Sequence, residues 1–346
     1  MNTRLAIAIA AALLLPLGAA TPEISIAQGT SGELRIALRI RPPGDAGAGL
    51  PNYEASVRRA LLDTGTPRSI ALASMSTRAP ATREDASIGN DRVVRAAETA
   101  PDDALVQWIA AERLLALHDD ARAGPIVSKL TAQESDNAAA WSLALALAQL
   151  HEESLRIDDA LARMAASTRA DEHVGDAMHA WLDVYEAHPR PRSAFVNPAE
   201  ADAAPFADAM TAAKAMRVSH DAFASACAAA SEASRRHACA GAARVLLHTS
   251  TSVATRELGF SVLERLGDAN EADRAERRDL AWIRANADRT SALDAASLDA
   301  VRSDWETLGD EAGVLRRAMR RAGVAADAPD GWSPDGSGAI ARSGAG

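Results

Sequence analysis

The sequence predicts an all-α protein, an α-solenoid of antiparallel helix hairpins with an extended N-terminal arm and a flexible C-terminal tail. Three observations support this fold class. Of the 346 residues, 48% are hydrophobic but only 3% are aromatic, and alanine, the best helix former, supplies much of the apolar total. Few runs of β-branched or aromatic residues could form strands. Apolar residues instead recur at helical spacing over most of the chain.

Composition and charge exclude several classes of protein. The chain is too hydrophobic to be disordered as a whole. Its formal net charge of −10 argues against a protein that binds nucleic acid through the phosphate backbone, because such a protein needs a basic face. The lack of alternating strands and helices excludes most nucleotide-binding α/β folds.

Residues 1–20 have the features of a signal peptide. Arg4 gives a positive start, an apolar run follows from Leu5 to Leu15, and small residues continue to Ala20. The predicted cleavage site follows Ala20, with cleavage after Ala27 as the alternative. An uncleaved N-terminal anchor is a further alternative, although the run is short for a membrane span. We therefore expect a mature protein without a membrane span that is periplasmic or secreted.

Residues 21–51 are expected to form an extended arm and linker. Apolar and charged or small residues alternate in part of it, which predicts one short strand that has no partner, with apolar positions at Leu34, Ile36, Leu38 and Ile40. The Pro/Gly-rich segment 42–51 predicts a linker.

Residues 52–323 are expected to form the helical-repeat domain. Gly65 ends the first helix, Thr66 caps the second and Pro67 stands in its first turn. Residues 80–89 are expected to be irregular, and residues 324–346 to be a flexible tail. The predicted helices span about 53–63, 67–79, 91–99, 103–118, 121–133, 137–150, 155–168, 176–186, 200–216, 219–230, 234–248, 251–265, 271–287, 297–308 and 311–322.

The two cysteines, Cys227 and Cys239, are predicted to form a disulfide, as an oxidising compartment allows. Twelve residues of one continuous helix would separate them by roughly 18 Å, so the bond requires a chain reversal. Ser231–Ser234 lies at the midpoint and can provide a turn and a helix cap. Two buried thiols are the alternative.

Three stretches share one spacing, an Asp followed five residues later by a Trp: Asp103–Trp108, Asp136–Trp141 and Asp176–Trp181. Asp at a helix start can accept hydrogen bonds from free backbone N–H groups, and a Trp one turn later can anchor the helix against its partner. We therefore predict that Trp108, Trp141 and Trp181 are core anchors of repeated helix hairpins. A tryptophan platform that stacks on carbohydrate or peptide is the alternative.

Over residues 103–190 these stretches resemble tetratricopeptide (TPR) repeats. Asn137 and Trp141 lie where the family has a polar start and an apolar packing residue, and Ala160 lies at a close-packing position of the second helix. The sequence departs from the family at Leu145, where a small residue is usual. It also lacks the closing proline, and its inter-helix loop looks about three residues longer. The resemblance implies an α-solenoid that binds peptides or proteins in a concave groove.

Short motifs that could carry chemistry are incomplete. His151–Leu155 begins like a zinc-protease motif but lacks the second histidine. His173, Asp176 and His179 could be metal ligands, although a polar helix start explains them as well. Glu134 and Ser135 resemble the Glu-Ser pair of lytic transglycosylases without the segment that follows it there. Arg316–Gly323 places arginines near a helix C-terminus, which suits the dipole or, alternatively, an anionic partner.

The sequence therefore predicts no catalytic residue, no metal site and no cofactor. We expect an exported, noncatalytic helical-repeat protein that binds an unidentified protein or peptide in the bacterial envelope. The alternatives are a cell-envelope enzyme with an unrecognised site and a secreted effector.

Overall fold

The computed structural model describes residues 22–28, 34–40, 50–75, 83–195, 198–214, 220–228, 230–286 and 295–334. The predicted leader (1–20) lies outside these residues. In the part of the chain that is described, a β-hairpin precedes a body of fifteen α-helices, so the all-α prediction is confirmed for the body. The helices are α1 (Leu50–Thr64), α2 (Pro67–Met75), α3 (Arg83–Thr99), α4 (Ala104–Ala116), α5 (Asp120–Gln133), α6 (Ala138–Leu150), α7 (Ser154–Ala166), α8 (Val174–Ala187), α9 (Pro198–Lys214), α10 (Asp221–Ala228), α11 (Ala233–Thr249), α12 (Val253–Leu266), α13 (Glu271–Asn286), α14 (Ala295–Leu308) and α15 (Glu311–Arg321).

The start of α3 differs from the sequence-based prediction. Residues 83–89 were predicted to be irregular but belong to the helix. A contact from α4 helps to hold this segment, because Arg113 Nε donates to Asn90 Oδ1 at 3.1 Å. Gly89 leaves the space for that guanidinium, since a Cβ there would lie 2.9 Å from Arg113 Nη2. The helix depends on a tertiary contact that local sequence does not reveal.

The N-terminal arm contains a hairpin and not the single strand that the sequence predicts. Strand β2 (Leu34–Ile40) pairs antiparallel with β1 (Pro22–Gln28), with Ile26 opposite Ile36. The prediction of a strand at 34–40 is correct, and the prediction that it has no partner is wrong. Strand β1 lies beside α9.

Two consecutive helix hairpins, α4–α5 and α6–α7, have matching bounds that differ by 34 residues. Asp103 and Asn137 cap their first helices, each of 13 residues. The turn between the two helices contains one residue with positive φ in each hairpin, His118 and Glu152. Because α7 begins at Ser154, the inter-helix loop is short, and the expected three-residue extension is wrong.

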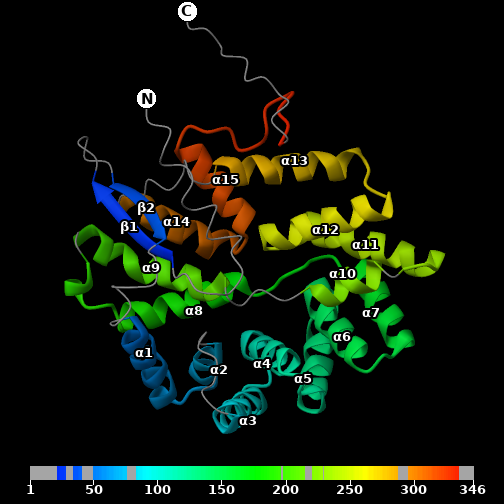
Figure 1. The fold of residues 1–346 in the computed structure, drawn as a ribbon, viewed down its shortest axis with the longest axis horizontal. Coiled ribbons are helices and arrows are strands. Elements are labelled where there is room, and N and C mark those ends of the chain that lie inside the picture. The colour runs from blue at the N-terminus through cyan, green and yellow to red at the C-terminus, as the bar shows by residue number, and fades with distance from the viewer. Residues whose placement is uncertain are drawn as a thin grey trace, which may run out of the picture.

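The helices close into a ring, whereas a solenoid predicts an open row (Figure 1). From α1 to α7 each helix packs on the next, and α7 then packs on α11. The ring continues through α12, α13, α15, α14, α9 and α8, and α8 contacts α1. The hairpin of α8 and α9 therefore turns back toward the start of the chain and closes the stack.

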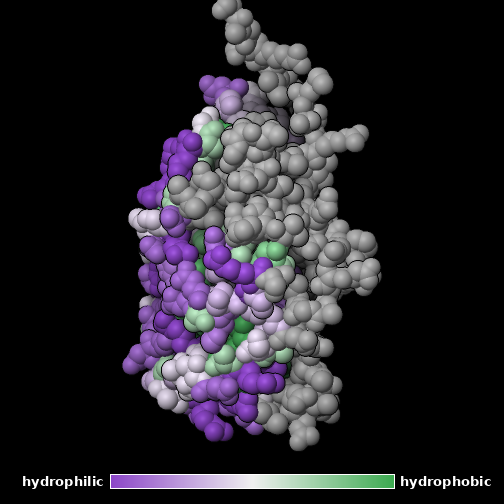
Figure 2. Space-filling model, turned by 90° about the vertical axis from the view of Figure 1, so that its left-hand side faces the viewer, coloured by the Kyte–Doolittle hydropathy of each residue, from purple (hydrophilic) through white to green (hydrophobic). Residues whose placement is uncertain are grey.

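Where Figure 2 colours the side of the ring that bears α1, α8 and α9, the surface is mostly hydrophilic, with small hydrophobic areas between polar side chains. Below the surface, the buried residues fall into two clusters. One includes Trp108, Trp181 and Trp305, and the other includes Leu145, Phe223 and both cysteines. Many alanines in both clusters are fully buried, so neighbouring helices can approach closely.

The predicted disulfide is present in the structure. Cys227 lies near the end of α10 and Cys239 in the second turn of α11, with their Cα atoms 5.6 Å apart. The chain reverses between them at about the predicted position, because α11 begins at Ala233. A bridge across so short a loop stabilises the fold by about 3 kcal/mol.

The first part of the predicted tail, residues 324–334, is held against α13. Trp282 Nε1 donates to Ala325 O at 2.9 Å, and the ring of Trp332 packs edge-on against Trp282 at 5.2 Å. The rest of the predicted tail (335–346) lies outside the described residues. None of the helices in the described ranges is both long and apolar enough to cross a membrane.

Candidate functional site

Four helices, α6, α8, α12 and α15, begin close together near the middle of the ring (Figure 1). Their preceding segments are joined by two isolated parallel β-bridges, Asn137 to Arg169 and Ala170 to Ser250. Glu311 N also donates to Thr251 O at 2.9 Å. We call this meeting point of helix N-termini and extended segments the hub.

Two polar side chains in the hub act as helix caps. Asn137 Oδ1 accepts hydrogen bonds from the backbone N–H groups of Ala139, at 3.1 Å, and Asp171, at 2.8 Å. Glu311 Oε2 accepts from Val253 N at 3.0 Å, so a residue of α15 caps α12. Free N–H groups and the helix dipole favour negative charge at these positions. The acidic character of the hub therefore has a structural explanation.

His173 lies at the start of α8, with its side chain 5% exposed. Its Nδ1 is 3.0 Å from Asp176 Oδ2, and its Nε2 is 3.1 Å from Glu134 Oε1. Burial lowers the pKa of His173, but the hydrogen bonds to the two carboxylates outweigh burial and raise the pKa to about 10. The imidazole is thus charged at neutral pH, and both of its nitrogens are engaged by carboxylates.

The structure also bears on two alternatives from the sequence, a transglycosylase-like role for Glu134 and a metal site formed by His173, Asp176 and His179. Glu134 accepts hydrogen bonds from Asn137 and His173. His179 Nε2 is buried without a hydrogen-bond partner. In the described part of the chain, no group of three His, Cys, Asp or Glu side chains could hold a metal ion.

A second hub group contains a carboxylate that is not a cap. Glu172 Oε1 lies 2.6 Å from both His220 Nε2 and Thr255 Oγ1, while Glu172 Oε2 is buried without a partner. Burial, and then the negative charge of Glu172, raise the pKa of Glu112 well above its usual value. Glu112 itself is partly exposed on α4. These four residues are the most enzyme-like group of the hub.

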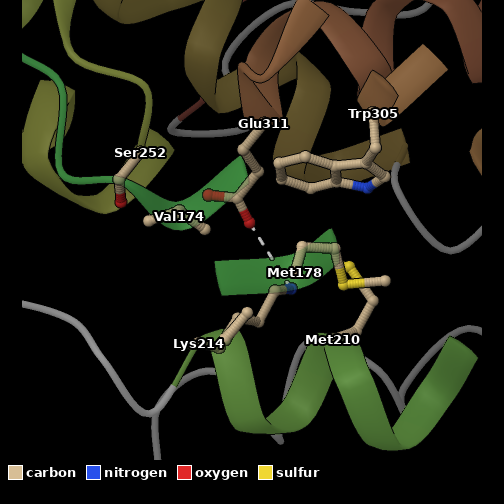
Figure 3. A pocket seen from close by; sticks show the side chains of 8 residues that line it. Val174, Met178, Met210, Lys214, Ser252, Trp305 and Glu311 are labelled. Carbon is tan, nitrogen blue, oxygen red and sulfur yellow. Dashed lines mark ion pairs between the residues drawn. The ribbon is translucent and has the colours of Figure 1, made fainter. Parts of the chain in front are cut away.

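A small pocket adjoins the hub between α8, α9, α14 and α15 (Figure 3). Lys214 Nζ pairs with Glu311 Oε1 at 3.4 Å across it, and Ser252 Oγ on its wall is buried without a partner. The pocket has room for about one water molecule, so it is too small for an organic ligand. Its other lining residues are Val174, Met178, Met210, Ala213 and Trp305.

The three tryptophans of the Asp-Trp spacing are not equivalent in the structure. Trp108 is fully buried and its ring meets His173 edge-on at 5.4 Å. Trp181 is 4% exposed, whereas Trp141 is only partly buried. Asp103 caps α4 as predicted, by accepting from Val106 N at 3.3 Å. The three Asp-Trp pairs also start at different positions relative to their helices, because Asp103 is the cap of α4, Asp136 precedes the cap of α6 and Asp176 lies within α8.

The other two Asp residues of that spacing are not helix caps. Asp136 precedes the cap residue Asn137 and contacts Arg169, and Asp176 lies in the first turn of α8, where it contacts His173. Several other motif residues are likewise engaged in ion pairs. His151 pairs with Asp120, and Arg317 and Arg321 both pair with Asp304.

One exposed surface was missed by the sequence analysis. Leu117, Leu150 and Leu155 are 44%, 40% and 86% exposed, and they are the exposed large hydrophobic side chains of the described ranges. All three lie at the turns between the helices of the α4–α5 and α6–α7 hairpins. We call residues 117–120 together with residues 150–156 the turn edge. Leu117 and Leu150 stand at helix ends, which was the available signal in the sequence.

Comparison with known proteins gives no relative. No protein-family profile, no curated protein and no solved structure matches this chain.

Proposed function

We propose that this protein is an exported, noncatalytic helical-repeat module that binds a protein or peptide partner in the bacterial envelope. The observation that carries the proposal is the turn edge, where the exposed leucines of two adjacent hairpins, Leu117, Leu150 and Leu155, gather on one surface. Such apolar side chains cost free energy in water and gain it when a partner covers them.

Two further features support this proposal. The α4–α5 and α6–α7 hairpins repeat at 34 residues, which is the period of TPR repeats, and that family binds peptides and proteins. Glu172 and His173 of the hub are buried, so the proposal places the partner on the exposed turn edge and not on the concave groove that the resemblance implies. The disulfide accords with export to an oxidising compartment.

Site-specific crosslinking tests the proposed function. A photoreactive amino acid at position 155 is compared in intact cells with one at position 265, since Arg265 is exposed on α12. We expect a discrete adduct from position 155 only. The adduct should weaken when Leu117 and Leu150 are both changed to Ser. Identical adducts from positions 155 and 265, or none from position 155 in any growth condition, would contradict a binding role for the turn edge.

A cell-envelope enzyme is the second candidate, and one observation favours it. Glu112 has a raised pKa and Glu172 has an unpartnered buried oxygen, and a carboxyl group of raised pKa near a second carboxylate is an arrangement that hydrolases use. The test is release of soluble fragments from envelope glycans and peptides by the wild type and by Glu112→Gln. Release that Glu112→Gln abolishes would establish the enzyme, and no release by the wild type would support the noncatalytic role.

A further inference from the structure

We infer that the turn edge takes a partner segment in which leucine-sized apolar side chains stand next to lysine or arginine. This inference rests on the proposed function and adds the chemistry of the partner. The inference follows from the position of the two turns, from their charges, and from the charges of the partners that could cover them.

The two turns form one surface. His151 Nε2, in the turn after α6, lies 3.0 Å from Asp120 Oδ2, in the turn after α4. Leu117 stands three residues before Asp120, and Leu150 directly precedes His151. The ion pair therefore holds the two leucine-bearing turns side by side, and Leu155 follows in the first turn of α7.

The charges of this surface are mainly negative. The turn edge carries four carboxylates, those of Asp119, Asp120, Glu152 and Glu153, and the guanidinium group of Arg156. The guanidinium group of Arg122 lies two residues beyond it. Both guanidinium groups are already paired. Arg122 binds Asp91 and Asp119, and Arg156 Nη1 lies 2.9 Å from Glu153 Oε2. The leucines are thus bordered by a surplus of negative charge.

This charge pattern selects among the possible occupants. A second copy of the chain that docks through the same surface would bring carboxylates against carboxylates, which is unfavourable. Anionic lipid headgroups would be repelled for the same reason. A segment with apolar and basic side chains satisfies both features, because it buries the leucines and its basic groups can approach the exposed carboxylates of Glu152 and of Asp120, which also contacts His151.

The test uses fluorescently labelled helical peptides of three compositions, Leu/Lys, Leu/Glu and Ser/Lys, and measures their binding to the full mature protein by anisotropy. We expect the Leu/Lys peptide to bind at least tenfold more tightly than either of the others. Leu150→Ser with Leu155→Ser should weaken that binding about tenfold. Asp120→Asn with Glu152→Gln should weaken it severalfold and reduce its dependence on salt.

Glu264→Gln is the matched control, because Glu264 is an exposed carboxylate on α12, outside the turn edge, and it should leave binding unchanged. Equal binding of the Leu/Glu and Leu/Lys peptides would overturn the inference. An absence of binding by all three peptides would also overturn the inference. If position 155 still gives its specific crosslink in cells in that case, the proposed function stands. If both experiments fail, the proposed function fails as well.

Discussion

The two sides of the ring are held together by different chemistry. Where α4 to α7 stack, the contacts are made by alanines, leucines and Trp108, and the starts of α4 and α6 are capped by Asp103 and Asn137. Where the ring closes, α1, α8 and α9 meet through Tyr53, Tyr185, Trp181, Arg190 and Asp208. Both tyrosines of the chain are at this closing seam. The repeated hairpins pack closely through small residues, whereas the single contact that closes the ring is made by large aromatic and charged side chains.

The largest expected effect concerns the hub, through the pH dependence of stability. The pKa of His173 rises from 6.5 to about 10 on folding. A group whose pKa is higher in the folded state stabilises it fully below the unfolded pKa and loses this effect as pH rises through the folded pKa. The free energy of unfolding should therefore fall between pH 6.5 and 10, by up to roughly 4–5 kcal/mol. Urea unfolding across this range measures it.

His173→Gln provides the control for this prediction. The variant lacks the titrating imidazole, so it should be less stable than the wild type at pH 6.5 and should lose most of the slope above that pH. A wild-type profile that is flat from pH 6.5 to 10 would show that the hub does not depend on the charged imidazole.

The next prediction tests whether Trp108 and Trp141 contribute equally to the stability of the fold. Trp108→Ala removes a fully buried side chain and should cost about 4 kcal/mol. Trp141→Ala should cost less than half as much, because Trp141 is partly exposed and its Nε1 donates to Ser135 O near the surface. Chemical denaturation of both variants measures the difference. Equal losses would restore the interpretation of Trp108 and Trp141 as equivalent repeat positions.

Local features of the fold could be predicted from the sequence, and features between distant segments could not. Helix bounds followed from capping residues such as Asp103 and Asn137, and the disulfide followed from Cys227 and Cys239 together with a turn between them. These signals act within one helix hairpin.

The hub escaped prediction because its partners are far apart in the chain. Glu172, for example, binds Thr255 at a separation of 83 residues. The ring closure escaped for the same reason, since Tyr53 OH donates to His188 O across 135 residues. Periodicity reveals which face of a helix is buried, but it does not reveal which helix covers that face.

At the closing seam, Asp208 gives a pH dependence in a lower window. Burial raises the pKa of Asp208 from 3.8 to about 6, although Arg190 opposes the shift. The folded state therefore holds this proton more tightly than the unfolded state, so stability should fall as pH rises from about 4 to 6. The loss from this group should be about 2–3 kcal/mol. Asp208→Asn should flatten the profile in this window and leave the window above pH 6.5 unchanged.

The smallest effect separates hydrogen bonding from aromatic packing at the seam. Tyr53 stacks on Tyr185 at 6.3 Å between ring centroids, Arg190 lies over its other face at 5.6 Å, and its hydroxyl donates to His188 O at 2.8 Å. Tyr53→Phe keeps both ring contacts and removes only the hydrogen bond, so it should cost about 1 kcal/mol. Tyr53→Ala removes all three contacts and should cost roughly 2–3 kcal/mol, because the side chain is only partly buried. Thermal unfolding with hydrogen exchange locates the change. Faster exchange confined to α1 and α8 would show that the ring opens at its seam, whereas uniform exchange would show that the ring unfolds as one unit.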